Sequence, residues 1–176
     1  MLIRTEAPAD ILAIDRLLRS SFATDTEARL VMALRENSRT TLSLVACNDE
    51  GELIGHALFT AVTLDGDDLG WQGLAPLTVA EAYRGQGVAA ALIREGVESL
   101  PMLGYPVCVV LGNPDFYHRF GFESAAHYQL HCEWDAPEGA FQVLAMSDSA
   151  LPLPQGKIEY SPEFALCESE LSDSAR

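Results

Sequence analysis

The 176-residue chain is 48% hydrophobic and 21% charged, a composition that predicts a single folded domain and excludes an intrinsically disordered protein. Its 26 acidic residues outnumber its 11 basic residues, and the net charge of −15 leaves no basic face for nucleic acid. The same acidity either attracts a cationic substrate or serves solubility alone.

The distribution of residues excludes two further classes, membrane-spanning proteins and zinc proteins. No apolar stretch approaches the roughly 18 residues that cross a bilayer, and no signal-peptide pattern follows Met1. The four cysteines are widely spaced, with no CxxC pair and no nearby cluster with histidine. We therefore expect a cytoplasmic protein with no membrane partner and no metal site.

Hydrophobic periodicity divides the chain into helical and β segments. Apolar residues spaced at three and four positions predict helices, and β-branched runs bounded by Gly, Asn or Asp predict strands. The runs on either side of Asn48 to Gly51 predict an antiparallel hairpin. In chain order we predict a strand over residues 2–4, helices over 11–18 and 25–37, strands over 41–47, 52–59 and 71–79, a helix over 88–100, a buried strand over 107–111, a short helix over 115–120, and strands over 127–132 and 141–146.

Two acidic segments lie outside these elements. Asp65, Asp67 and Asp68 resemble the start of a calcium loop, but no further ligands follow at EF-hand spacing, which favours a solvated turn. Residues 166–176 are rich in Ser and Glu without periodicity, and this predicts a disordered acidic tail. The folded domain is therefore expected to span residues 1–165.

A glycine-rich loop around Arg84 lies where a predicted strand passes into a predicted helix. Helix N-termini expose unpaired N–H groups, and Gly85 and Gly87 let the backbone approach an anion closely. Arg84 can add a charge-assisted contact. We expect a phosphate-bearing ligand here, the alternative being a plain structural loop.

The kind of phosphate ligand is narrowed by the residues around the loop. A Walker A loop requires a lysine, and the loop has none. Residues 85–90 fit the dinucleotide pattern GxGxxG/A, but Ala80 to Arg84 separate the loop from its strand, and the next strand ends without an acidic residue. A dinucleotide-binding oxidoreductase is therefore a remote alternative.

Two motifs in the correct order resemble the GNAT superfamily of acyl-CoA-dependent N-acyltransferases. Arg84-x-x-Gly87-x-Ala89 resembles that family's pyrophosphate loop, and Tyr117-x-x-x-Gly121-Phe122 is similar to its tyrosine motif. Residues 111–122 look more narrowly like the bacterial YhbS-type subgroup of predicted N-acetyltransferases. The resemblance covers about residues 1–165, and it implies an α/β (α+β) fold with a mixed, mostly antiparallel sheet of six to seven strands flanked by helices.

The resemblance also implies acetyl-CoA as co-substrate and assigns residues to it. The backbone of Leu77, Thr78 and Val79 is expected to pair with the pantetheine arm, which Asn113 also approaches. Tyr117 is expected to face the CoA sulfur. The residues expected to hold the CoA pyrophosphate are Arg84, Gly85, Gln86, Gly87, Val88, Ala89 and Ala90.

The chemistry of acetyl transfer gives two of these residues a role. An amine that attacks a thioester directly generates an oxyanion and expels a thiolate, so the site needs an N–H donor and a proton source. Pro76 interrupts a sheet ladder, and a bulge there would free the Leu77 N–H for the first role. Tyr117, protonated at neutral pH, would supply the proton, unless it is only a core tyrosine. His56 and Asp68 are candidate bases that also fit structural roles, so we assign no base.

These residues predict an N-acetyltransferase that transfers an acetyl group from acetyl-CoA to a primary amine. The expected acceptor is a cationic small molecule or a protein amino group, while its identity and the acyl-chain preference stay open. A catalytically silent acyl-CoA sensor or interaction module of the same fold is the alternative. The sequence leaves the oligomeric state open, a homodimer included.

Overall fold

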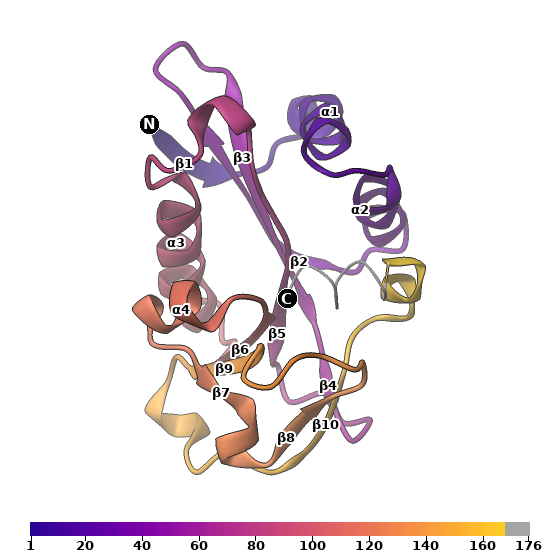
Figure 1. Cartoon of the computed structure of the whole chain (residues 1–176), viewed down its shortest axis with the longest axis vertical. Helices are drawn as coiled ribbons and strands as arrows, with labels where there is room; N and C mark the ends of the chain where they lie inside the picture. The colour runs from indigo at the N-terminus through magenta and orange to yellow at the C-terminus, as the bar shows by residue number, and fades with distance from the viewer. Residues whose placement is uncertain (168–176) are drawn as a thin grey trace.

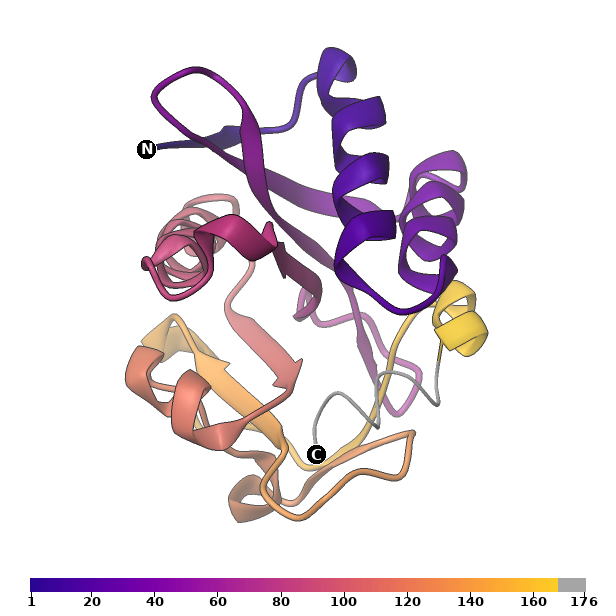
Figure 2. The same ribbon diagram turned by 45° about the horizontal axis from the view of Figure 1, so that its top comes forward.

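The computed structural model describes residues 1–167, and a seven-stranded sheet runs through it (Figures 1 and 2). The strands are, in chain order, β1 (Leu2–Thr5), β2 (Thr40–Cys47), β3 (Leu53–Ala61), β4 (Thr63–Leu64), β5 (Gln72–Val79), β6 (Val107–Leu111), β7 (Glu123–Ser124), β8 (Leu130–Cys132), β9 (Phe141–Ala145) and β10 (Gly156–Glu159).

The main sheet has the order β1-β2-β3-β5-β6-β9-β7, and only β5 and β6 run parallel. The expected mixed, mostly antiparallel sheet is therefore confirmed, and so is the hairpin of β2 and β3. A smaller sheet has the order β4-β10-β8.

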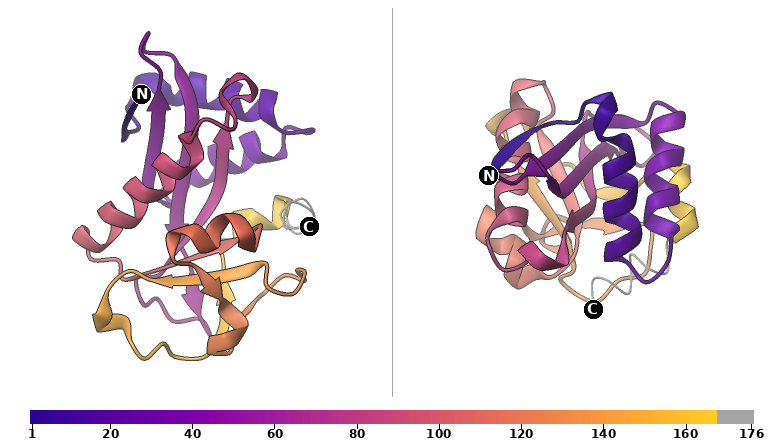
Figure 3. Two further views of the ribbon diagram at one scale, coloured as in Figure 1. Left: turned by 60° about the vertical axis from the view of Figure 1, so that its left-hand side comes forward. Right: turned by 90° about the horizontal axis from the view of Figure 1, so that it is seen from above.

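Helices cover both faces of the main sheet (Figure 3). On one face lie α1 (Ile11–Ser21) and α2 (Thr26–Glu36), and on the other lie α3 (Val88–Met102) and α4 (Pro114–Tyr117). Each of the longer helices turns one apolar stripe to the sheet: α1, for example, buries Ile14, Leu17 and Leu18 at helical spacing. The remaining helical segments are 3₁₀ turns: η1 (Pro8–Asp10), η2 (Glu81–Tyr83), η3 (His118–Phe120), η4 (Ala125–Tyr128), η5 (Asp148–Ala150) and η6 (Pro162–Cys167).

The predicted strand over residues 127–132 is wrong in its first half. The 3₁₀ segment η4 reaches Tyr128, and Gln129 then takes the left-handed φ of +59°. Only Leu130–Cys132 is extended, and it pairs with β10 in the smaller sheet rather than with β9. β4, β7 and β10 were not predicted, because the extended form of these short strands depends on pairing partners distant in the chain.

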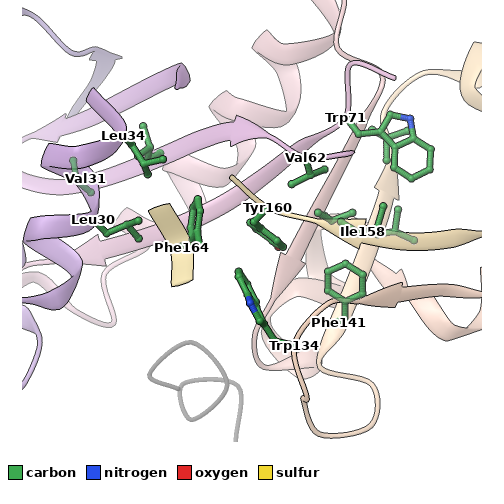
Figure 4. Close-up of a cluster of buried hydrophobic side chains, with 14 of the residues drawn as sticks. Leu30, Val31, Leu34, Val62, Trp71, Trp134, Phe141, Ile158, Tyr160 and Phe164 are labelled. Atoms are coloured by element: carbon green, nitrogen blue, oxygen red, sulfur yellow. The ribbon is translucent and has the colours of Figure 1, made fainter. Parts of the chain in front are cut away.

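Apolar side chains fill the space between the α1/α2 face and the smaller sheet. Figure 4 shows this cluster, in which Leu30, Val31 and Leu34 of α2 lie at one end and Ile158 of β10 at the other. Its aromatic side chains are stacked or tilted against one another, with ring centroids 4.6 Å apart for Trp134 and Tyr160 and 5.1 Å for Tyr160 and Phe164. The chain thus returns from β10 to close the core beneath α2.

Two expectations concern the chain ends and the membrane. The predicted tail over residues 166–176 lies outside the described residues from position 168 onward, and η6 occupies its first two positions. Among residues 1–167, no helix is long and apolar enough to cross a membrane.

Candidate active site

β5 and β6 pair over only three residues, and this leaves a gap within the main sheet. Gln72–Leu74 pair in parallel with Cys108–Val110, and the ladder then ends. Between Leu74 and Leu77, β5 has one residue more than the facing part of β3, which forms a β-bulge containing Pro76. The predicted interruption at Pro76 is therefore confirmed.

The hydrogen-bond phase of the ladder determines which backbone groups of β5 face this gap. The Ala80 N–H donates to the Ile54 carbonyl at 2.8 Å, which fixes the phase between β3 and β5. Because an antiparallel ladder alternates, the Thr78 N–H points toward β3, and the Leu77 and Val79 N–H groups point away from it. β6 does not pair at this level. Of the three predicted residues, only Leu77 and Val79 therefore direct their N–H groups toward the gap.

The loop after β5 ends at the N-terminus of α3. No side chain of the described residues caps this end of the helix. Gly87 is the N-cap, and its φ of +83° is a left-handed value that favours glycine. No acidic residue lies in the first turn of α3. The free N–H groups and the helix dipole therefore favour a bound anion. Arg84 lies beside them, fixed by its Nε–H donating to the Val79 carbonyl at 3.1 Å.

A cavity of about 280 Å³ lies over this loop. Phe116 and Arg119 also line it, and we did not predict either from the sequence, although both lie within two residues of Tyr117. A larger cavity, of about 410 Å³, lies near Met1 and Asp49 and contains no residue of the loop. Predicted cofactor residues that line the loop cavity are Val79, Arg84, Gly85, Gly87, Val88, Ala89 and Ala90.

Tyr117 lies at the other side of the gap, against the end of β6. Its ring is half-buried and packs so closely on Gly112 that a Cβ there would lie 2.5 Å from Tyr117 Cε2. Phe116 and Phe122 meet the ring edge to face, with centroids 5.0 and 5.8 Å away. Burial, and then the neighbouring Cys108, raise the pKa of Tyr117 above its ordinary value of 10. The hydroxyl is therefore protonated at neutral pH.

The two candidate bases occupy structural positions. The His56 side chain has no exposed area, its Nε2 lies 2.9 Å from the Ser43 hydroxyl, and burial lowers the pKa of His56 to about 4. Asp68 lies in the turn before β5, where its carboxylate accepts the Gly70 N–H at 2.9 Å. That turn is roughly 15 Å or more of extended strand away from Leu77. Neither side chain is available to an acceptor at the gap.

Five predicted cofactor residues do not line the loop cavity: Leu77, Thr78, Gln86, Asn113 and Tyr117. Gln86 turns its amide back to the Ala82 carbonyl, to which it donates at 3.2 Å. The Asn113 side chain accepts the Asp115 N–H at 2.9 Å and so caps α4 at its N-terminus. Asn113 thereby places the first turn of the helix that carries Tyr117.

Two other chemistries find no support in the described residues. Residues 1–167 contain no group of three or more His, Cys, Asp or Glu side chains that could hold a metal ion. The dinucleotide-binding alternative is wrong, because it needs a doubly wound parallel sheet, and β5 and β6 are the one parallel pair of the main sheet as described.

Comparison with known proteins agrees with this geometry. Residues 39–124 match the family model of the acetyltransferase (GNAT) domain. Over 164 residues the chain is 52% identical to the Uncharacterized N-acetyltransferase YhbS of Escherichia coli K12, which covers 93% of this chain and 98% of that protein. The crystal structure of E. coli YhbS with CoA has a TM-score of 0.89 at 51% identity, covering 93% of this chain and 91% of that chain. A GNAT acetyltransferase from Brucella melitensis with acetyl-CoA has a TM-score of 0.77 at 34% identity, covering 93% and 97%.

Proposed function

The chain belongs to the GNAT family of N-acetyltransferases, and we propose that it transfers the acetyl group of acetyl-CoA to a primary amine by direct attack. The observation that carries this proposal is the gap between β5 and β6, which has an uncapped helix N-terminus at one end and Tyr117 at its side. The similar proteins from E. coli and B. melitensis bind CoA and acetyl-CoA, respectively.

The residues around the gap fit two polar parts of acetyl-CoA, the pyrophosphate and the pantetheine arm. A Cβ at Gly87 would meet no atom within 4 Å, so the backbone is open to a pyrophosphate that accepts from the first N–H groups of α3. Arg84 and Arg119 face the same cavity and would balance its charge. The Leu77 and Val79 N–H groups would pair with the amide-bearing pantetheine arm as a missing strand would.

When bound, acetyl-CoA supplies an acetyl thioester that amines can attack. The Leu77 N–H donates to the acetyl oxygen as negative charge develops there. The Tyr117 hydroxyl, which carries its proton at neutral pH, donates that proton to the leaving sulfur. We assign no base on this chain. A cationic amine loses one proton to water before it attacks, and the proton that its nitrogen loses after attack returns through water to Tyr117.

Cysteine chemistry gives independent support to direct transfer. Cys108 is the cysteine that contributes to the raised pKa of Tyr117, and its side chain is fully buried. Burial raises the pKa of Cys108 to about 12, so it is a neutral thiol rather than a nucleophilic thiolate. A route through an acetylated Cys108 would need that thiolate.

The proposed acceptor is a positively charged amine, on a small molecule or on a protein, because the chain carries a net charge of −15. The acidic turn before β5 does not act by contact at the gap. It lies beside β10, where Asp65 accepts the Lys157 N–H at 2.9 Å. The attraction would therefore come from the field of the whole molecule.

Thermal unfolding with separate ligands tests the cofactor. We expect acetyl-CoA to raise Tm, with a stabilisation that grows with the logarithm of its concentration above Kd, and NADH and FAD to leave Tm unchanged. Stabilisation by NADH or FAD without stabilisation by acetyl-CoA would overturn the proposal. Binding of acetyl-CoA with no turnover on any amine would instead favour the silent acyl-CoA sensor.

A further inference from the structure

Three arginines near the glycine loop have no acidic partner in a strongly acidic protein. Among residues 1–167, Arg4, Arg19, Arg35 and Arg39 form ion pairs with carboxylates. Arg84, Arg94 and Arg119 form none within the same part of the chain, although the chain has 26 acidic residues for 11 basic ones. Arg16 and Arg29 also form none there, but neither lines a cavity that the other three line. Their positive charge is therefore available to a ligand.

Aromatic rings, rather than carboxylates, hold two of these guanidinium groups. The Arg94 Cζ lies 5.2 Å from the centre of the Phe120 ring. The Arg119 Cζ lies 5.4 Å from the centre of Phe116 and 5.5 Å from that of Phe120. A cation–π contact uses no N–H donor, and among residues 1–167 neither guanidinium donates a hydrogen bond to another residue. The aromatic rings thus hold both arginines in place and leave their N–H groups free to donate to a ligand.

Arg119 belongs to two cavities at once. One is the loop cavity already described, and the other, also of about 280 Å³, is lined by Arg94, Val97, Glu98, Arg119 and Phe120. The second cavity therefore continues from the first, along α3 and away from β5. A ligand bound at the glycine loop would therefore have room for a further charged group in the cavity that Arg94 lines.

We propose that this second cavity is a separate phosphate subsite that binds the 3′-phosphate of the CoA ribose through Arg119 and Arg94. The inference rests on the proposed use of acetyl-CoA, and it adds a site that discriminates CoA from its dephosphorylated form. A phosphate monoester matches the planar fork of a guanidinium, which donates two parallel hydrogen bonds to it. Glu98 also lines the cavity, and its carboxylate opposes an anion there.

Arg94 and Glu98 carry opposite charges, so replacing them should change the affinity for CoA in opposite directions. Calorimetry with CoA and with 3′-dephospho-CoA is carried out on the parent protein, Arg94→Ala and Glu98→Gln. We expect Arg94→Ala to weaken CoA roughly tenfold, the contribution of one hydrogen bond to a charged group, and to leave dephospho-CoA unchanged. Glu98→Gln should tighten CoA and leave dephospho-CoA unchanged. Arg94 and Glu98 are exposed on α3, so neither change removes core packing.

A charge-matched control separates a local contact from the overall field. Arg16 on α1 is exposed and lines neither cavity, so Arg16→Ala should affect neither ligand. Equal effects of Arg94→Ala on both ligands, or on neither, would overturn the subsite while leaving the proposed function standing. Failure of the parent to bind CoA and dephospho-CoA alike would overturn the proposed function and the subsite together.

Discussion

Tyr117 is positioned by the residues around it rather than by a hydrogen bond that any described group makes to its hydroxyl. Gly112 gives the ring room at the end of β6, and Phe116 and Phe122 hold its edges. The sequence motif predicted the tyrosine, but the tight contact with Gly112 is a tertiary feature without a local pattern. A residue with a side chain at position 112 would displace the ring.

Removing the hydroxyl alone should separate chemistry from binding. We expect Tyr117→Phe to lower kcat by roughly 100-fold or more, since the leaving sulfur loses its proton donor, and to leave the Kd of acetyl-CoA nearly unchanged. Thiol release and calorimetry measure the two quantities. Tyr105→Phe removes a hydroxyl at the far end of β6 and serves as the control. An unchanged kcat in Tyr117→Phe would rule out the tyrosine as the acid.

The ion pair of Arg4 and Asp10 makes stability depend on pH in a defined direction. Arg4 and the Ala7 N–H donate to Asp10 at 2.7 to 3.0 Å, and they hold the pKa of Asp10 at about 2, below its ordinary 3.8. A lowered carboxyl pKa stabilises the folded state above pH 4, and this stabilisation is lost as the pH falls toward 2.

We therefore expect Asp10→Asn to lower the free energy of unfolding at pH 7 by about 1 kcal/mol or less, and Tm with it, because Arg4 is partly exposed. The difference from the parent should shrink between pH 4 and pH 2, as thermal melts across that range would show. The exposed Asp49→Asn serves as control. A difference that stays constant down to pH 2 would contradict the assigned cause.

At the scale of elements, the glycine loop and α3 act as one unit. The loop predicts an anion site only because a helix begins at its end, and that junction was readable from Gly87 followed by an apolar helical pattern. Long periodic elements such as α1, α3 and β3 were predicted close to their observed bounds. β4, β7 and β10 were not, because their extended form depends on pairing partners distant in the chain.

The same reasoning explains which parts of the site escaped prediction. Arg119 and Phe116 reach the loop cavity because the segment after β6 folds back toward α3, a proximity that sequence spacing does not encode. Gln86 and Asn113 are predicted to contact the cofactor, and a local backbone group engages one polar atom of each side chain. Short polar side chains at turns commonly make such bonds.

Two glycines of matched geometry test the loop. Gly87 and Gly51 have φ values of +83° and +82°, and a Cβ at either would meet no atom within 4 Å. Substitution of either glycine by valine should therefore lower the free energy of unfolding by a similar amount, roughly 1–2 kcal/mol. We expect only Gly87→Val to abolish acetyl-CoA binding in calorimetry, since Gly51 lies in the hairpin turn. Binding by Gly87→Val at parental affinity would show that the loop does not hold the cofactor.

At the scale of the whole molecule, the net charge of −15 should act on the acceptor through encounter rate. Such attraction between solvated charges weakens as the Debye length falls from about 10 Å at 0.1 M salt to about 3 Å at 1 M. We expect kcat/KM to decline with salt for a cationic amine and to stay level for a neutral one. Parallel curves would assign the acidity to solubility alone.

Amine-dependent release of the CoA thiol measures the proposed reaction as a whole. Parent protein and acetyl-CoA are incubated with small cationic amines, neutral amines and peptides bearing lysine or a free N-terminus, and acetylated products are identified by mass spectrometry. We expect at least one amine to accelerate thiol release with formation of its N-acetyl product, and Tyr117→Phe to lose that acceleration while still binding acetyl-CoA. Bound acetyl-CoA with no acceleration by any amine would contradict an acetyltransferase acting at this gap.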